Sequence, residues 1–453
     1  MGVEGFSRWF ACESGAAACR TDPNRLKPRH QRALTATRRD CYRRTMRKRL
    51  FFSVGEPSGD QHAAGLIRHW RSTGTPIDVR GFGGPHMAAA GAALDLTLTD
   101  HAVVGIVEVL PKIREFFRFV DQAEAVFARG EVDGVVLVDF PGFNWHIAKR
   151  AKKYGLPVTY YCPPQLWAWG GWRIGKLRRT VDEVLCVLPM EVDYYKRHGV
   201  PHTFVGHPFF DHVAESRLDA ELVDRLRTEG RPTVAVLPGS RSGEVAKNWP
   251  VMRAAMERLS RDTPSPRFVV ACAKEKHRRR CEADGPIRNA PGNTVDVVFT
   301  TGHASEAIEA ADAAMMVSGS VSLEMMARRT PAAVLYRVSR SLNFIARRLV
   351  HLDSITLPNL IAGRRIYPEM VSTGDPGPAV DFLVDSIRSM IGDPFYAAGI
   401  RRDLDRLCDD HARPGATVNA ADRLAATIGA SEARSIFDGT ERSGSQTERP
   451  LAA

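Results

Sequence analysis

Cysteine is scarce in this 453-residue sequence, and its eight cysteines show none of the spacings that bind zinc or build a disulfide framework. No two of them form a C-x-x-C pair, and Cys12, Cys19 and Cys41 fall within the first 49 residues. The sequence therefore predicts a protein of a reducing compartment, without a disulfide scaffold, a metal site or a bound cofactor.

Long apolar runs are also missing. No segment of about 18 residues is purely apolar, as a membrane-spanning helix would require. The longest uncharged run, Tyr154–Trp172, contains three prolines and three glycines and cannot form such a helix. The N-terminus lacks the apolar core of a signal peptide. We therefore expect a cytoplasmic protein that at most touches a membrane surface.

Basic residues outnumber acidic ones, but most of the excess lies at one end of the chain. The net charge is +11, and residues 1–49 alone carry 13 Lys and Arg against 4 Asp and Glu. The remaining body is nearly neutral, so a nucleic-acid-binding surface is not supported. Residues 1–49 have no apolar periodicity and are expected to form a disordered tail. Translation from Met46, which precedes a basic triplet and a strand, is a further hypothesis.

From Leu50 onward, short apolar runs alternate with helical patterns, which predicts parallel sheets built from βαβ units. The expected strands of a first sheet are Leu50–Val54, Ile77–Phe82, Gly134–Val138, Pro157–Cys162, Glu183–Leu188 and Thr203–Val205. The expected strands of a second sheet are Thr233–Leu237, Arg267–Ala271, Val295–Phe299, Ala313–Val317 and Ala332–Tyr336.

The fold class that follows is α/β, with two Rossmann-like, doubly wound domains at 50–213 and 214–390 that face each other across a cleft. Helical patterns over 391–430 can return to the N-terminal domain, and the polar residues 431–453 are expected to form a second disordered tail. Ligands bind at the carboxyl edges of such sheets, so the loops that follow the strands are the candidate sites.

Two loops of the first domain carry carboxylates. The segment Gly55–Asp60 opens a helix whose N-terminus favours an anion, and Asp139 ends a buried apolar strand. A carboxylate at that position is costly unless it is paired or in use, and a catalytic base needs such partial desolvation. The structural alternatives are helix caps, namely Ser58 or Asp60 in the first loop and Asp139 in the second. Capping does not require Glu56.

Two loops of the second domain are rich in small residues. Arg241 lies in the segment 237–244, which also opens a helix and can cradle a phosphate. The N–H groups of Gly319 and Ser320 would face a diphosphate, and Glu324 could accept from ribose hydroxyls. The alternatives are a surface cation at Arg241 and a plain turn that places Glu324 in a favourable first helical turn. Together the two loops suggest a nucleoside diphosphate.

An apolar stripe with cationic flanks runs over 103–120, and it predicts either a core-facing helix or a membrane-surface helix. The segment 163–172 concentrates three of the seven tryptophans, which favours either buried core or a wall for sugar and acyl chains. His207, at the end of a strand, either contacts a ligand or caps that end. The segment 357–363 is a loop fixed by Pro and Gly near the second cleft wall, or only a connection.

These motifs, in this order, resemble the lipid-A-disaccharide synthase family of inverting glycosyltransferases, which have the GT-B fold. The resemblance runs from about residue 49 to about residue 365, and more weakly to about residue 428. The motifs that carry it are GEPSGD at 55–60, VVGIVEVL at 103–110, VDFPGFN at 138–144, PPQLWAW at 163–169, VGHP at 205–208, LPGSRSGEV at 237–245, SGSVSLE at 318–324, YRVS at 336–339 and LPNLIAGR at 357–364.

The resemblance implies a reaction between UDP-2,3-diacylglucosamine and 2,3-diacylglucosamine 1-phosphate, which gives a tetraacyl disaccharide 1-phosphate and UDP. It implies metal-free catalysis as a step of lipid A (lipopolysaccharide) biosynthesis, by a peripheral protein at the cytoplasmic face of the inner membrane. The N-terminal domain would serve the acceptor and the membrane, and the C-terminal domain the UDP-sugar. A homodimer is compatible with this assignment.

The resemblance also implies residue roles. Asp139 matches the family's proposed base, and Glu56 is the second candidate. The residues expected to bind the UDP-sugar are Ser240, Arg241, Gly319, Ser320, Glu324, Arg337 and Asn359. The residues expected to contact the acceptor or the membrane are Ser58, Val107, Val109, Leu110, Ile113, Phe116, Phe117 and Trp169. Gly142 stands where the family usually has a second acidic residue.

Three alternatives remain at this point. The chain could be another GT-B enzyme, such as a different lipid-linked transferase or a UDP-sugar 2-epimerase, which would need no lipid acceptor. It could be a UDP-sugar-binding regulator without catalysis. An RNA-binding role of the arginine-rich tail is disfavoured by the nearly neutral body.

Overall fold

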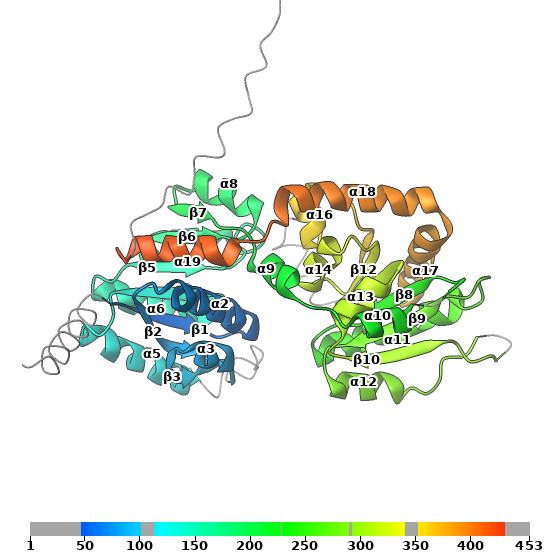
Figure 1. Cartoon of the computed structure of the whole chain (residues 1–453), viewed down its shortest axis with the longest axis horizontal. Coiled ribbons are helices and arrows are strands. Elements are labelled where there is room, and N and C mark those ends of the chain that lie inside the picture. Colours follow the sequence, from blue (N-terminus) through cyan, green and yellow to red (C-terminus); the bar gives the residue numbers. More distant parts are fainter. Residues whose placement is uncertain (1–46, 101–112, 228, 290–291, 340–351, 431–453) are drawn as a thin grey trace, which may run out of the picture. The chain divides into compact units, whose positions relative to one another are not determined.

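A computed structural model describes residues 47–100, 113–227, 229–289, 292–339 and 352–430. These residues form two α/β domains, each built on a parallel sheet (Figure 1). The tails at 1–46 and 431–453 and the apolar segment 101–112, with Val107, Val109 and Leu110, lie outside the described residues.

The first sheet has the strand order β3-β2-β1-β4-β5-β6-β7, and every pairing in it is parallel. Its strands are β1 (Lys48–Val54), β2 (Ile77–Gly83), β3 (Ala93–Thr97), β4 (Gly134–Val138), β5 (Val158–Tyr161), β6 (Glu183–Cys186) and β7 (His202–Phe204). The helices between them are α2 (Pro57–Thr73), α3 (Pro85–Ala90), α5 (Ile113–Ala128), α6 (Pro141–Lys153), α7 (Ile174–Thr180) and α8 (Pro189–Arg197).

The second sheet repeats this topology with the order β10-β9-β8-β11-β12-β13, again parallel throughout. Its strands are β8 (Thr233–Leu237), β9 (Arg267–Cys272), β10 (Val297–Thr301), β11 (Ala313–Met316), β12 (Ala332–Arg337) and β13 (Glu369–Ser372). The helices from here to the C-terminal side are α9 (Pro208–Glu215), α10 (Ala220–Leu226), α11 (Ser242–Leu259), α12 (Glu275–Glu282), α13 (Ala304–Ala310), α14 (Val321–Ala327), α16 (Leu357–Ala362), α17 (Gly377–Gly392), α18 (Pro394–His411) and α19 (Ala416–Thr427).

Alternation along the central strands divides the core of the first domain into two layers. Phe51 and Leu137 pack with apolar residues of α5 and α6 on one face. Phe52 and Val138 pack with α2 and α19 on the other. Because successive side chains of a strand point to opposite faces, a strand covered by helices on both sides must be apolar throughout. This is why the run 134–138 is uninterrupted.

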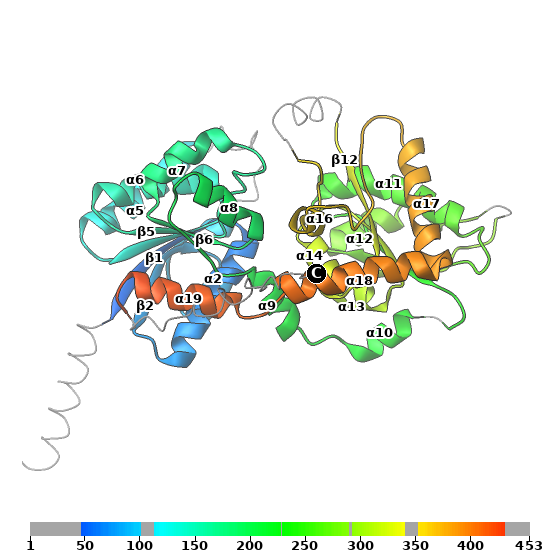
Figure 2. The same ribbon diagram turned by 90° about the horizontal axis from the view of Figure 1, so that it is seen from above.

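The last helix, α19, packs against α2 of the first domain, although more than 340 residues separate them in sequence (Figure 2). The indole Nε1 of Trp70 donates to the carbonyl oxygen of Ala421 at 3.0 Å. The Asp211 carboxylate in α9 accepts hydrogen bonds from backbone N–H groups at the N-terminus of α19, including that of Thr417 at 2.6 Å. The C-terminal segment therefore completes a core that begins near residue 50.

Several elements differ from the prediction. β3 and β13 were not predicted, because their residues are only partly buried or lie in a polar context. The strand expected over Val295–Phe299 begins two residues later, at Val297. The segment expected as a Pro- and Gly-fixed loop forms α16, since Pro358 occupies the first turn and Gly363 ends the helix in a left-handed conformation.

Candidate active site

The two central strand pairs, β1 with β4 and β8 with β11, lie where the strand order of each sheet reverses. The loops after these strands are the segments with the polar and glycine residues singled out in the sequence. In open parallel sheets this reversal point opens a crevice at the carboxyl edge, where ligands bind. The topology therefore places the candidate residues at two equivalent edges.

Backbone strain is concentrated at the edge of the first sheet. Four described non-glycine residues have a positive φ, and three of them, Asp139, Phe140 and Cys162, directly follow β4 or β5. Asp139 and Phe140 have φ of 47° and 43°, so two successive residues have a left-handed backbone conformation. Such strain costs of order 1–3 kcal/mol per residue and is retained where the surrounding structure enforces it, often at functional sites.

The Phe140 ring lies directly against Gly55 at the end of β1. A Cβ atom on Gly55 would stand 2.3 Å from a ring carbon of Phe140, so no other residue fits there without movement. Gly59 likewise lets α2 approach β4, and a Cβ built on it would lie 3.6 Å from Oδ2 of Asp139. The two glycines of GEPSGD thus serve the Asp139 turn as well as their own loop.

Two buried side chains hold the backbone carbonyl of Asp139. The amide Nδ2 of Asn144 donates to it at 2.8 Å, and the hydroxyl of Tyr160 donates to it at 2.6 Å. Asn144 is anchored in turn by the hydroxyl of Ser53, which donates to Oδ1 at 2.6 Å. Asn144 and Tyr160 are positioning residues for this turn. The last letter of VDFPGFN carried no predicted role, and Tyr160 gave no sequence signal beyond an apolar strand.

The Asp139 carboxyl has a raised pKa. Burial raises its pKa to about 7, with a further rise from the neighbouring Glu56 carboxylate. Burial also raises the pKa of Glu56, while the charge of Arg241 lowers it. A carboxylate with a pKa near the working pH can take a proton effectively and still be ionised in a large fraction of molecules.

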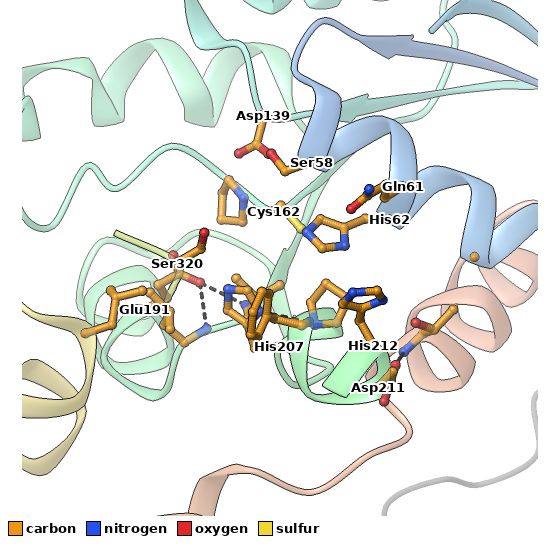
Figure 3. A pocket seen from close by; sticks show the side chains of 18 of the residues that line it. Ser58, Gln61, His62, Asp139, Cys162, Glu191, His207, Asp211, His212 and Ser320 are labelled. Carbon is orange, nitrogen blue, oxygen red and sulfur yellow. Dashed lines mark hydrogen bonds between the residues drawn. The ribbon is translucent and has the colours of Figure 1, made fainter. Parts of the chain in front are cut away.

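A cavity of about 1140 Å³ opens at this edge (Figure 3). Five of the predicted site residues line it: Ser58, Asp139 and Trp169 of the first domain, and Gly319 and Ser320 of the second. Those that do not line it are Glu56, Ser240, Arg241, Glu324, Arg337, Asn359, Phe116 and Phe117.

The loop after β8 is organised by one carboxylate. Oε2 of Glu244 accepts from the backbone N–H groups of Ser240 and Arg241 at 3.1 and 3.2 Å. Arg241 is highly exposed and its Nη1 contacts Oε1 of Glu244 at 3.1 Å. The N–H groups of Ser240 and Arg241 are therefore engaged, whereas the Arg241 guanidinium has further donors.

The remaining residues predicted for the nucleotide are engaged within the second domain. Oε1 of Glu324 pairs with Nε of Arg328 at 3.1 Å. Nη2 of Arg337 donates to the carbonyl oxygen of Gly374 at 2.7 Å. Asn359 is buried, and its Oδ1 accepts from the backbone N–H groups of residues 366 and 367 at 2.8 and 2.9 Å. Asn359 therefore stabilises the chain after α16.

The residues predicted to touch acceptor or membrane divide into two groups. The ring of Phe116 packs beside those of Phe140 and Phe143, with centroids 6.3 and 5.7 Å apart, and is part of the site's support. Phe117 is 45% exposed, and Trp169 is 43% exposed at the cavity wall. For Ile113, only its place at the start of α5 is described.

Two pocket residues were missed by the sequence reasoning. Glu191 in α8 is fully buried; its Oε2 accepts from the N–H groups of Val187 and Leu188, while its Oε1 has no partner among the described residues. Burial raises its pKa to about 7. His62 lines the cavity from α2. Glu191 lies in none of the motifs singled out in the sequence, and His62 lies just after GEPSGD, outside the motif.

Comparison with known proteins decides the family. The profile of the lipid-A-disaccharide synthetase family matches residues 50–375. The chain belongs to this family. A lipid-A-disaccharide synthase of Geobacter sulfurreducens is 34% identical over 360 residues, which is 79% of this chain and 91% of the relative. The chain is accordingly a glycosyltransferase of lipid A biosynthesis, and the family resemblance seen in the sequence is confirmed.

Solved structures share the GT-B fold of this chain at low sequence identity. A UDP-GlcNAc 2-epimerase of Neisseria meningitidis bound to UDP-GlcNAc has a TM-score of 0.53 at 11% identity, covering 80% of this chain and 99% of that one. A sucrose-phosphate synthase of Thermosynechococcus elongatus has a TM-score of 0.53 at 13% identity, covering 85% and 100%. These likenesses concern the fold, and the family match disfavours the epimerase alternative.

Within the described residues, no helix is long and apolar enough to cross a membrane.

Proposed function

We propose that the chain transfers the sugar of UDP-2,3-diacylglucosamine to 2,3-diacylglucosamine 1-phosphate, with Asp139 as the general base. The observation that carries this proposal is the strained Asp139 turn, which lines the cavity and is held by Asn144 and Tyr160. Nothing in the packing of the sheet requires a strained, desolvated carboxylate at that place. Its raised pKa fits proton abstraction from a sugar hydroxyl.

In the proposed reaction, Asp139 takes the proton of the acceptor's 6-hydroxyl as that oxygen attacks the anomeric carbon of the donor. The new C–O bond forms on the face opposite UDP, the bond to the diphosphate oxygen breaks, and the configuration inverts. The electron pair of the broken bond leaves with UDP, whose new negative charge must be stabilised. Glu56 contributes by raising the pKa of Asp139.

The loop after β11 and the Arg241 guanidinium are proposed to bind the diphosphate. Gly319 and Ser320 line the cavity just before α14, and a Cβ built on Gly319 would meet nothing within 4 Å. The space beside this backbone suits a bulky phosphate. Ser240, Glu324, Arg337 and Asn359 are proposed to support the nucleotide side through the domain's own hydrogen bonds.

Peripheral attachment to the cytoplasmic face of the inner membrane is proposed from exposed aromatic and cationic side chains. Trp172 is 66% exposed, and the Arg173 guanidinium lies over both Trp169 and Trp172, 5.1 and 5.3 Å from the ring centroids. The two tryptophan rings and Arg173 form an amphipathic surface suited to lipid headgroups, and the exposed ring of Phe117 on α5 is proposed as a second contact. The apolar segment 101–112 is proposed to contribute to membrane contact. A homodimer remains a prediction.

The test is incubation of the full chain with both acylated substrates, followed by mass spectrometry for a tetraacyl disaccharide 1-phosphate. We expect this product together with UDP in equal amounts. UDP release without disaccharide would contradict acceptor use, and conversion of UDP-N-acetylglucosamine to its 2-epimer would support the epimerase alternative. Binding of UDP-sugar with neither product would support a regulator.

A further inference from the structure

A histidine-lined part of the cavity has no role in the mechanism above. One face of α2 contributes Ser58, His62 and Arg68 to the cavity wall, while the opposite face of the helix is packed in the core. His207, which is the N-cap of α9, lies across from it. The two rings of His62 and His207 meet edge to face, with centroids 6.3 Å apart (Figure 3).

The proton of His207 has a fixed place. Its Nδ1 accepts a hydrogen bond from the backbone N–H of Phe209 at 3.2 Å, so in the neutral ring the proton must lie on Nε2. Among the described residues, the bond from Phe209 is the one hydrogen bond made by the two rings, so Nε2 of His207 and both nitrogens of His62 are available to a ligand. The cavity wall therefore contains one N–H donor, Nε2 of His207, and a second imidazole, that of His62, beside it.

Both rings are uncharged near neutral pH. Burial lowers the pKa of His62 to about 4, with a further lowering from His212 and an opposing effect of Asp211. Burial and the neighbouring His62 lower the pKa of His207 to about 3. Asp211 cannot act as a close partner, because its carboxylate is bound by the N–H groups at the start of α19.

This location suits the far end of the acceptor sugar. His62 follows Gly59, which adjoins Asp139, by three residues or about 4.5 Å along the helix axis. That rise is comparable with the width of one sugar ring. C1, which carries the phosphate, and C5, which carries the 6-hydroxymethyl group, flank the ring oxygen, so the two groups lie about one ring width apart. A sugar whose 6-hydroxyl meets Asp139 can therefore reach the histidines with its phosphate.

Uncharged hydrogen-bond donors are also the groups best suited to bind a phosphate close to Asp139. An arginine or lysine next to Asp139 would lower the pKa of the base by favouring its charged form. Imidazole N–H groups can bind phosphate oxygens without that permanent charge. Arg68, which has no hydrogen-bond or ion-pair partner among the described residues, lies two further turns along α2 and adds a distant positive charge.

We propose that His62 and His207 bind the phosphate group of the sugar-phosphate acceptor and thereby place its hydroxyl at Asp139. This inference rests on the proposed function. Phosphate could also reach the pair as the diphosphate of the donor, so the test separates the two sources.

The test compares His207→Asn and His62→Phe with the wild type. Asparagine can still cap α9 through its side-chain oxygen, and phenylalanine keeps the ring of residue 62 without its nitrogens. For each variant we expect at least a tenfold rise of the acceptor KM, an unchanged KM for the UDP-sugar, and a kcat within a few-fold of wild type. With 2,3-diacylglucosamine that lacks the phosphate, wild type and variants should behave alike.

His202→Asn is the matched control, since this histidine lies outside the cavity, where its ring contacts the carbonyl oxygen of Val200 at 2.8 Å and packs near Tyr195. A rise of the UDP-sugar KM instead would assign the pair to the donor diphosphate and overturn the proposal. Equal losses with both acceptors would overturn it as well. Calorimetric titration of wild type and variants with acceptor alone and with UDP alone reads binding without turnover, so a failure of the proposed transfer reaction is distinguished from a failure of this assignment.

Discussion

The turns after β4 and β11 occupy the same position in two sheets of the same strand order, yet they are built in opposite ways. The first holds Asp139 and Phe140 in left-handed conformations and fixes their backbone with Asn144 and Tyr160. The second has small residues, and a Cβ on Gly319 would meet nothing. One turn is closed by side chains around a carboxylate, and the other leaves its backbone accessible.

The difference shows how one topology can supply two chemistries. A base needs a desolvated and rigidly placed carboxylate, which requires side chains to crowd the turn. An anion site needs accessible backbone N–H groups and space for the ligand, which requires that large side chains be absent from the turn. The sheet sets the position, and the residues after each strand decide what that position does.

The largest effect is expected from Asp139→Asn, which removes the base but keeps the shape of the side chain. We expect kcat to fall by about 10²–10⁴-fold, the range of general base catalysis, because the acceptor hydroxyl must then ionise without help. UDP affinity, measured by calorimetry, should stay within twofold of wild type. Near-normal turnover would remove Asp139 as the base and leave the strained turn without its proposed function.

The second prediction contrasts one glycine from each edge. Gly55→Ala should destabilise the fold by about 1–3 kcal/mol, because the new methyl group overlaps the Phe140 ring. Gly319→Ala should leave the free energy of unfolding nearly unchanged. Urea denaturation of both variants measures the difference. Equal stabilities would show that the first turn can relax, and the contrast between a crowded and an open turn would then be wrong.

The third prediction concerns the nucleotide side alone. Arg241→Ala should weaken UDP binding about tenfold, the loss of roughly one charge-assisted hydrogen bond, with little change in the pH dependence of the chemical step. Calorimetry with UDP gives the affinity. Arg253→Ala, which removes an arginine that pairs with Glu257 within α11, is the control. An unchanged UDP affinity in Arg241→Ala would leave this exposed side chain as a surface cation.

The fourth prediction concerns pH. Since the acid form of Asp139 is inactive as a base and its pKa is about 7, kcat should rise with pH through that region. The Glu56 carboxylate contributes to the raised pKa, so Glu56→Gln should move this acid limb to lower pH. Glu257→Gln, far from the cavity, should not. A limb that stays in place or moves upward in Glu56→Gln would contradict the coupling of the two carboxyls.

The smallest effect is expected from two neighbouring tyrosines of β5. Tyr160→Phe removes the hydroxyl that donates to Asp139 and should cost about 0.5–1.5 kcal/mol of stability, together with a loss of kcat. Tyr161→Phe removes a buried hydroxyl without a partner among the described residues and should be neutral or stabilising. Thermal denaturation and steady-state rates of both variants test this. A loss of kcat in Tyr161→Phe as large as that in Tyr160→Phe would contradict the positioning role.

Much of the fold follows from local patterns in the sequence. Uninterrupted apolar runs such as 134–138 identify the buried central strands, and glycine-containing loops between a strand and a helix locate the edges. Strands that lack such runs, β3 and β13, escaped prediction because partial burial leaves no strict pattern. For Asn359 the motif is visible in the sequence, but its hydrogen bonds to the chain after α16 are not, because they join residues that only the fold brings together.

The sequence by itself determined the family, the buried central strands of both sheets, and the position of the carboxylate directly after β4, because each depends on residues that are close together in the chain. Only the tertiary structure decided what surrounds them. The Phe140 ring on Gly55, the two donors at the carbonyl of Asp139, and the pairing of His62 with His207 all join residues from separate elements. Such contacts depend on how helices pack on a sheet, and no local pattern of residues encodes that packing.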